Sequence, residues 1–127
     1  MCGIAAWLSN ESISSAVLLQ MTNAVTHRGP DGEGYAGLSD LDESLKLCSK
    51  DQVASKFMRL ALGHRRLSIV DLSDAGLQPM CSASGDLWII FNGEIYNHPE
   101  LRVELESEGV SFHSGTDTET VLACWEK

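Results

Sequence analysis

Apolar runs with the composition of β-strands alternate along this chain with segments that have the apolar spacing of helices. The runs at 60–71 (LALGHRRLSIVD) and 86–92 (DLWIIFN) are rich in Leu, Ile, Val, Phe and Trp, and turn-prone residues separate them. Residues 3–8 predict a further short strand. This order predicts an α+β fold of layered antiparallel sheets flanked by helices, with 60–71 and 86–92 as central strands.

Three segments carry the helical pattern. In 13–26 the apolar residues recur every three or four positions, and the polar cluster at 9–12 supplies turn residues and an N-cap. The segment 98–108 has a proline near its start and ends at Gly109, and a last helix begins at 117. We expect one more short strand at 110–112. The last helical pattern has no closing Gly or Pro, which predicts a domain cut at its C-terminus.

Length and charge narrow the class of protein. The 127 residues fit one domain (1–127), and 43% hydrophobic residues are enough for a core. The formal net charge is −9 and the basic residues are scattered, so we expect no nucleic-acid partner. Neither a signal peptide nor an apolar run of membrane-spanning length is present, so we expect a cytoplasmic protein without membrane contact.

The cysteines and histidines do not have the spacing of a metal site or a disulfide framework. Cysteines stand at positions 2, 48, 81 and 124, too far apart for a CxxC pair. We interpret the last three as small, at least half-buried side chains. His27 and His64 lack an HxxxH partner, so we expect them to make structural hydrogen bonds and predict no metal ligands.

Cys2 is the exception because of its position directly after Met1. If Met1 is removed, Cys2 carries a free α-amine, which titrates near neutral pH and can take the proton of the adjacent thiol. One residue then supplies both nucleophile and base. Position alone favours the plainer interpretation that Cys2 is a small second residue.

Five further residues have the chemistry that acyl transfer from a free amino acid such as glutamine requires. Asn92 and Gly93 follow a strand and offer side-chain and backbone donors for an oxyanion, although an Asn-Gly pair alone more often marks a hairpin turn. Arg66 suits an α-carboxylate, and Glu94 and Asp117 suit an α-ammonium. Each of these charges alone is more often a surface charge.

Taken together, the motifs point to a family. They are MCGI at 1–4, HRGPDG at 27–32, GHRRLSIVDLSDAGLQPM at 63–80, FNGEIYN at 91–97, LR at 101–102 and GTDTE at 115–119. In this order they resemble the class II glutamine amidotransferase domain of glutamine-hydrolysing asparagine synthetases. The resemblance covers the chain from end to end and implies an N-terminal-nucleophile hydrolase fold.

The resemblance also implies roles for individual residues. Cys2 is the nucleophile, Asn92 and Gly93 form the oxyanion pair, Arg66 holds the glutamine carboxylate, and Glu94 and Asp117 hold its α-amino group. The backbone of the next segment lines the same pocket, namely Leu67, Ser68, Ile69 and Val70. The HRGPD loop shapes the site next to Cys2.

In the resembled reaction, L-glutamine is hydrolysed through a Cys2 thioester to glutamate and ammonia. The ammonia passes through a tunnel to a C-terminal synthetase domain that uses ATP and magnesium to make asparagine from aspartate. That domain is absent from these residues, so we expect no cofactor in this chain. Two alternatives are an amidotransferase that supplies another acceptor, such as a surface polysaccharide or a secondary metabolite, and a non-catalytic module of the same fold.

The segment 38–59 is longer than the resemblance leads us to expect. We interpret it as a flap or as a contact of a homodimer, and the sequence does not decide between them.

Overall fold

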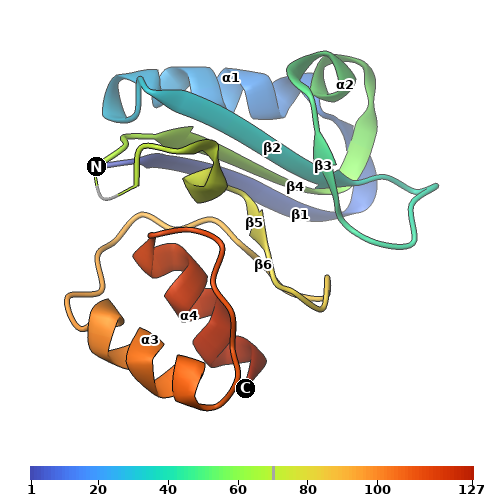
Figure 1. The fold of residues 1–127 in the computed structure, drawn as a ribbon. Helices are drawn as coiled ribbons and strands as arrows, with labels where there is room; N and C mark the ends of the chain where they lie inside the picture. The colour runs from blue at the N-terminus through green and yellow to red at the C-terminus, as the bar shows by residue number, and fades with distance from the viewer. Residues whose placement is uncertain (70) are drawn as a thin grey trace.

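A four-stranded antiparallel sheet forms the centre of the protein, of which a computed structural model describes residues 1–69 and 71–127. The strands lie in the order β1-β4-β2-β3 (Figure 1). Their bounds are Gly3–Ser14 for β1, Gly32–Leu38 for β2, Lys46–Cys48 for β3 and Phe57–Arg66 for β4. Since β4 pairs with both β1 and β2, the apolar run at 60–71 supplies a central strand, as predicted.

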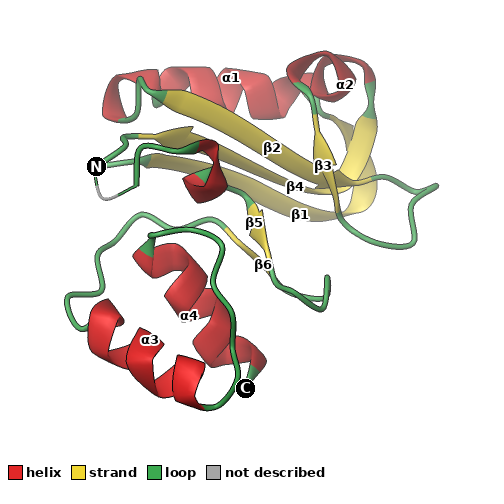
Figure 2. Cartoon of the chain, viewed as in Figure 1, coloured by secondary structure: helices red, strands yellow, loops and turns green. Residues whose placement is uncertain are grey.

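Two helices cover one face of this sheet and enclose the hydrophobic core. They are α1 (Ala16–Ala24) and α2 (Lys50–Ser55) (Figure 2). Leu18 of α1 and Val53 of α2 are fully buried in one cluster with Ala61 of β4. Because side chains alternate along a strand, Ala61 and Arg66 point to opposite faces of the sheet. The core thus occupies the helical side and leaves the other face for a second layer.

The second layer contains a short β-ribbon and two more helices. The ribbon consists of β5 (Met80–Cys81) and β6 (Trp88–Ile89), and the helices are α3 (His98–Ser107) and α4 (Asp117–Glu126). The two helices pack on each other, and α4 also contacts both strands of the ribbon (Figure 1). This arrangement confirms the predicted α+β class of antiparallel sheets flanked by helices.

The first strand is longer, and the first helix starts later, than the sequence pattern predicts. β1 continues to Ser14 because Ile13 and Ser14 pair with Met58 and Phe57 after an irregularity in the register. Ser15, instead of the cluster at 9–12, is the N-cap of α1, and its hydroxyl donates to the Lys56 carbonyl at 2.7 Å. Pairing with β4 therefore outweighs the helical spacing of these residues.

Two other strands are shorter than predicted. β4 ends at Arg66 instead of 71, and β6 contains only two residues of the run 86–92. The prediction that 86–92 is a central strand is wrong, because β6 belongs to the separate ribbon. Beyond β6, the Phe91 N–H donates to the Gln78 side chain at 2.6 Å. The chain therefore leaves β-structure at the places where the pocket described below begins.

The two C-terminal helices confirm the prediction. α3 ends before Gly109, whose φ of +91° is a conformation that glycine adopts most readily. The Thr116 hydroxyl accepts a hydrogen bond from the Glu119 N–H at 3.4 Å and caps α4. The strand predicted at 110–112 is wrong, because the Val110 N–H instead donates back to the Leu105 carbonyl at 3.0 Å and closes α3.

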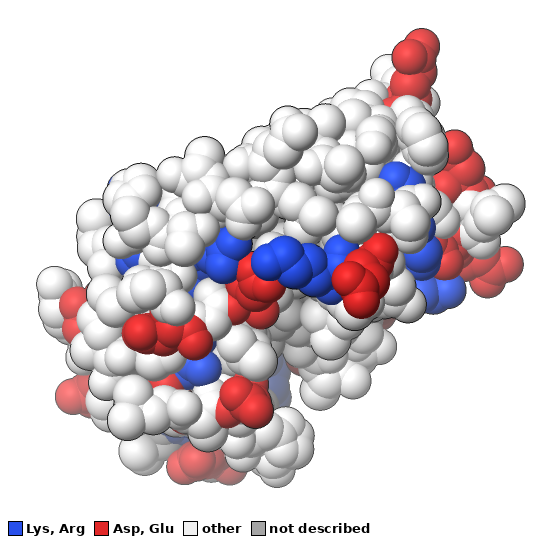
Figure 3. Space-filling model, turned by 90° about the horizontal axis from the view of Figure 1, so that it is seen from above, with Lys and Arg blue, Asp and Glu red and all other residues white. Residues whose placement is uncertain are grey.

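The segment 38–59 contains both a hairpin strand, β3, and the short helix α2. Ser49 and Gln52 form a reciprocal capping box at the start of α2. Lys50 of this helix pairs with Glu33 of β2 at 3.0 Å, and on the face seen in Figure 3 basic side chains lie next to acidic ones. The role of this segment as a flap or a dimer contact stays a prediction.

Candidate active site

A pocket of about 340 Å³ lies where four separate segments meet. Its walls come from the N-terminus, the end of β4 and the residues that follow it, the segment 91–96, and the start of α4. All of the predicted site residues that the structure describes line it, namely Cys2, Arg66, Leu67, Ser68, Ile69, Asn92, Gly93, Glu94 and Asp117. Val70, which was predicted with them, lies outside the described residues.

Cys2 is held at the end of the sheet, beside the end of β4. The Leu67 N–H donates to the Cys2 Sγ at 3.3 Å, and the Sγ lies 3.8 Å from the Leu67 carbonyl oxygen. This position follows from the register, in which Gly3 of β1 pairs with Arg65 of β4. The thiol is half-buried and lines the pocket. Met1 lines the same pocket, so its removal would open space directly beside the thiol.

The HRGPD loop supports both Cys2 and the wall that follows β4. Its first two residues belong to a 3-10 turn, η1 (Thr26–Arg28). Arg28 Nε donates to the Cys2 carbonyl at 3.0 Å. The Asp31 N–H donates to the Arg66 carbonyl at 3.0 Å, and the Asp31 carboxylate accepts from the Ser68 N–H at 2.8 Å. The loop therefore lies next to Cys2, as expected, and Arg28 is the contact that the sequence analysis did not identify individually.

Arg66 is a buried cation that forms no salt bridge with a carboxylate in the described part of the chain. Its side chain is oriented by backbone oxygens, because Nη1 donates to the Ser73 carbonyl at 2.6 Å and Nη2 donates to the Asp71 carbonyl. Only 6% of the residue is exposed, and it lines the pocket. A Cβ on Gly76 would lie 2.3 Å from Nη2, so any side chain at this position would displace the guanidinium. Such a group is suited to bind an anion.

Three carboxylates also line the pocket. Asp117 begins α4, and one of its oxygens accepts from the Ile95 N–H at 2.9 Å, while the other has no hydrogen-bond partner in the described part of the chain. Glu94 and Asp71 also line the pocket. The described lining thus combines one arginine with three carboxylates, a distribution that suits a ligand carrying both an anion and a cation.

Asn92 and Gly93 lie in the segment between β6 and α3. Both line the pocket with Cys2, and the described residues provide no hydrogen-bond partner for the Asn92 side-chain amide. Gln78 positions this segment, because its amide oxygen accepts from the Phe91 N–H and its nitrogen donates to the Thr118 hydroxyl at 3.0 Å. The sequence analysis gave Gln78 no role, although it lies within a motif that carries the family resemblance.

His64 differs from the sequence expectation. It is fully buried, and neither ring nitrogen makes a hydrogen bond of normal geometry among the described residues, although a backbone group of Phe91 lies close enough to favour the protonated ring. Burial lowers its pKa from 6.5 to about 4, and the Arg66 charge acts in the same direction. His64 is therefore neutral near neutral pH.

The described residues provide neither a metal-binding cluster nor a membrane-spanning helix. No group of three or more His, Cys, Asp or Glu side chains is placed to bind a metal ion together. None of the helices in ranges 1–69 and 71–127 has both the length and the apolar composition for a membrane span.

Comparisons with known proteins identify a family for this chain. A family model described as "Glutamine amidotransferase domain" matches residues 49–127. The glutamine-hydrolysing asparagine synthetase 1 of Bacillus subtilis (strain 168) is 36% identical over 98% of this chain, which spans 17% of that relative's length. A putative asparagine synthetase 2 of Methanocaldococcus jannaschii is 32% identical over 100% of this chain, which spans 24% of its length.

A relative with a different name has a similar level of identity. The glutamine–fructose-6-phosphate aminotransferase of Fusobacterium nucleatum is 32% identical over 100% of this chain and 22% of its own length. The chain thus spans about a sixth to a quarter of the length of these relatives. The names of these three relatives all refer to glutamine. The family model covers more than half of the chain. The chain therefore belongs to the class II glutamine amidotransferase domain family.

Proposed function

We propose that this chain is the glutamine-hydrolysing part of an asparagine-synthetase-like enzyme. The observation that carries the proposal is a single pocket lined by a thiol at the chain's second residue, by a buried arginine without an ion-pair partner among the described residues, and by carboxylates. This set of groups fits the side-chain amide, α-carboxylate and α-ammonium of L-glutamine.

The proposed reaction begins after Met1 is removed. The free α-amine of Cys2 takes the thiol proton, directly or through water, and the thiolate attacks the side-chain amide carbon of glutamine. The Asn92 amide and the Gly93 N–H donate to the oxyanion that forms. The carbon–nitrogen bond breaks, the leaving nitrogen receives the proton from the α-amine, and ammonia departs. Water then hydrolyses the thioester, which releases glutamate and restores the thiol.

The remaining pocket residues orient the substrate. Arg66 pairs with the α-carboxylate, and Asp117 and Glu94 accept hydrogen bonds from the α-ammonium. Leu67, Ser68 and Ile69 line the same pocket as the thiol and Arg66. Holding the substrate at its two charged groups places its amide at the thiol, which is how positioning contributes to the rate.

The ammonia acceptor is the finer part of the proposal. The names of several relatives favour a synthetase domain that makes asparagine from aspartate with ATP and magnesium. A second candidate is a different acceptor, because relatives named as a glutamine–fructose-6-phosphate aminotransferase and as an amidase have similar identity. The ATP and magnesium would bind in a domain outside these residues.

Product assays test both parts. We expect this chain to yield glutamate from glutamine, and a protein that joins it to the proposed synthetase domain to yield asparagine when aspartate, ATP and magnesium are added. In that longer protein, Cys2→Ala should abolish the glutamine-dependent reaction and keep asparagine formation from added ammonia. Glutamate without asparagine from the longer protein would indicate another acceptor. No glutamate from protein that has lost Met1 would indicate the non-catalytic module.

A further inference from the structure

We propose that Asp71 is a positioning residue that joins the two charged sides of the pocket, fixing Arg66 and Asp117 relative to each other. The inference rests on the proposed function, in which these two side chains bind the α-carboxylate and the α-ammonium of glutamine. Arg66 ends a strand of the first layer and Asp117 begins a helix of the second, so neither element fixes the other side chain by itself.

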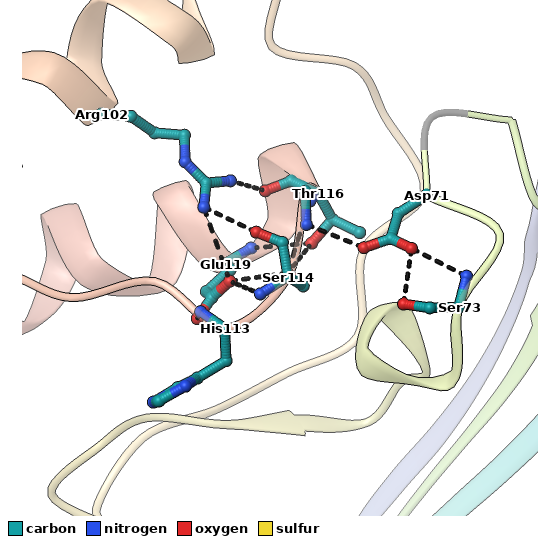
Figure 4. A network of polar contacts seen from close by, with 8 residues as sticks. Asp71, Ser73, Arg102, His113, Ser114, Thr116 and Glu119 are labelled. Atoms are coloured by element: carbon teal, nitrogen blue, oxygen red, sulfur yellow. Dashed lines mark hydrogen bonds and ion pairs between the residues drawn. The ribbon is translucent and has the colours of Figure 1, made fainter.

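On the side of Arg66, Asp71 acts through both its backbone and its side chain. Its carbonyl accepts from Arg66 Nη2. Its carboxylate Oδ1 accepts from the Ser73 N–H at 2.8 Å and from the Ser73 hydroxyl at 2.6 Å. The Ser73 carbonyl in turn accepts from Arg66 Nη1. Both backbone oxygens that orient the guanidinium therefore belong to one turn, which the Asp71 carboxylate closes (Figure 4).

On the side of Asp117, the second oxygen of the same carboxylate reaches across to the loop before α4. Asp71 Oδ2 accepts from the Gly115 N–H at 2.7 Å. Gly115 is two residues from Asp117, and Thr116 between them caps the helix. In Figure 4, Asp71 lies between Ser73 and the 113–116 loop, and dashed lines join its carboxylate to both segments. A shift of this contact would therefore move the start of α4 relative to Arg66.

The loop that Asp71 binds is itself held from its far side. The Glu119 carboxylate accepts from the N–H groups of His113 and Ser114 at 2.8 and 2.7 Å. Arg102 donates to the Ser114 carbonyl at 2.6 Å and stacks 4.0 Å from the Phe112 ring. These contacts fix the loop on α3 and α4, so the Gly115 N–H has a defined position. Its hydrogen bond to Asp71 therefore holds the loop of the second layer in place relative to the first layer.

The electrostatic state of Asp71 suits this role. Hydrogen bonds from the Ser73 hydroxyl and from the backbone of Gly115 and Ser73 lower its pKa from 3.8 to about 2. The carboxylate is therefore ionised at any pH at which the thiol reacts, and both of its oxygens act as acceptors.

The substitution Asp71→Asn tests the inference with little change in shape. One oxygen becomes an NH₂ group, which can only donate, so either the Gly115 N–H or the Ser73 donors face a donor. Asp74→Asn is the matched control, because it removes the same charge three residues away and the Asp74 carboxylate makes no hydrogen bond in the described part of the chain. We expect Asp71→Asn to raise the KM for glutamine about tenfold with kcat within about twofold, and Asp74→Asn to change neither.

Two further readouts separate positioning from general destabilisation. In an Asp117→Asn background the effect of Asp71→Asn on KM should largely disappear, because the group that it positions is gone. Independently of catalysis, the Gly115 amide hydrogen should exchange faster in Asp71→Asn than in the wild type or Asp74→Asn. An unchanged KM, an equal effect in the Asp117→Asn background, or unchanged exchange at Gly115 would each overturn the inference. An inactive wild-type protein would instead overturn the proposed function.

Discussion

Adjacent arginines on β4 do different work because they point to opposite faces of the sheet. Arg65 points to the helical side, where it pairs with Glu33 at 2.6 Å and donates to the Thr22 carbonyl. Arg66 points to the pocket, where only backbone oxygens bind it among the described residues. Composition does not distinguish the two residues, but strand alternation and the resemblance do, and both select Arg66.

Replacing each arginine by lysine separates these roles. A lysine at 66 keeps the charge but cannot hold two carbonyls and pair with a carboxylate in two hydrogen bonds at once. We expect Arg66→Lys to raise the KM for glutamine by roughly 10- to 100-fold, as expected for losing a charged hydrogen bond. Arg65→Lys is the control and should leave KM within about twofold. Steady-state glutaminase kinetics measure both, and equal effects would contradict the assignment.

At the scale of elements, the sequence predicts helices better than strand ends. α3 and α4 form as predicted because their caps, proline and apolar spacing are local signals. β4 and β6 are shorter than their apolar runs because the backbone N–H groups of Leu67 and Phe91 bind side chains, Cys2 and Gln78, instead of a neighbouring strand. These contacts join residues far apart in the sequence, so local pattern does not reveal them.

The candidate site shows the same limit. The predicted residues that the structure describes line one pocket. They could be identified from the sequence because each of them stands in a motif. The supporting contacts of Arg28, Asp71 and Gln78 were not predicted, since each depends on which carbonyl or N–H group the fold places opposite. The residues that line the pocket were thus identifiable from the sequence, whereas the contacts that support them required the structure.

The end of α3 provides a test at this scale. Gly109 has a φ of +91°, and a Cβ added there would have no atom within 4 Å, so a side chain costs conformational energy without a clash. We expect Gly109→Ala to lower the free energy of unfolding by about 1 kcal/mol. Gly109→Asn should lose less, because asparagine tolerates this conformation better. Urea unfolding compares them, and no loss in the alanine variant would contradict the assigned helix end.

For the molecule as a whole, the two layers are packed around a buried, neutral His64 on the pocket side of the sheet. Folding lowers its pKa from 6.5 to about 4, so between these values the unfolded chain binds a proton that the folded chain does not. The contribution of His64 to the free energy of unfolding is therefore fully present above about pH 6.5, and it is lost as the pH decreases toward 4. The lowered pKa of Asp71 affects the free energy of unfolding only at more acidic pH, below 3.8.

We expect the free energy of unfolding to fall by roughly 2 kcal/mol from this group between pH 7 and pH 4.5. A His64→Leu variant should show a much shallower dependence over the same range, whatever its stability at pH 7. Denaturant unfolding at several pH values measures the slope. Identical slopes in the two proteins would show that His64 is not the group that is responsible.

The central claim is that Cys2 is an N-terminal nucleophile in a glutamine-shaped pocket. The most direct test is the intact mass of the purified protein before and after exposure to an electrophilic glutamine analogue, with Cys2→Ala as control. We predict a protein that lacks Met1 and gains one adduct, and a control that gains none. A protein that lacks Met1 and stays unlabelled, or a control that is labelled equally, would contradict the account.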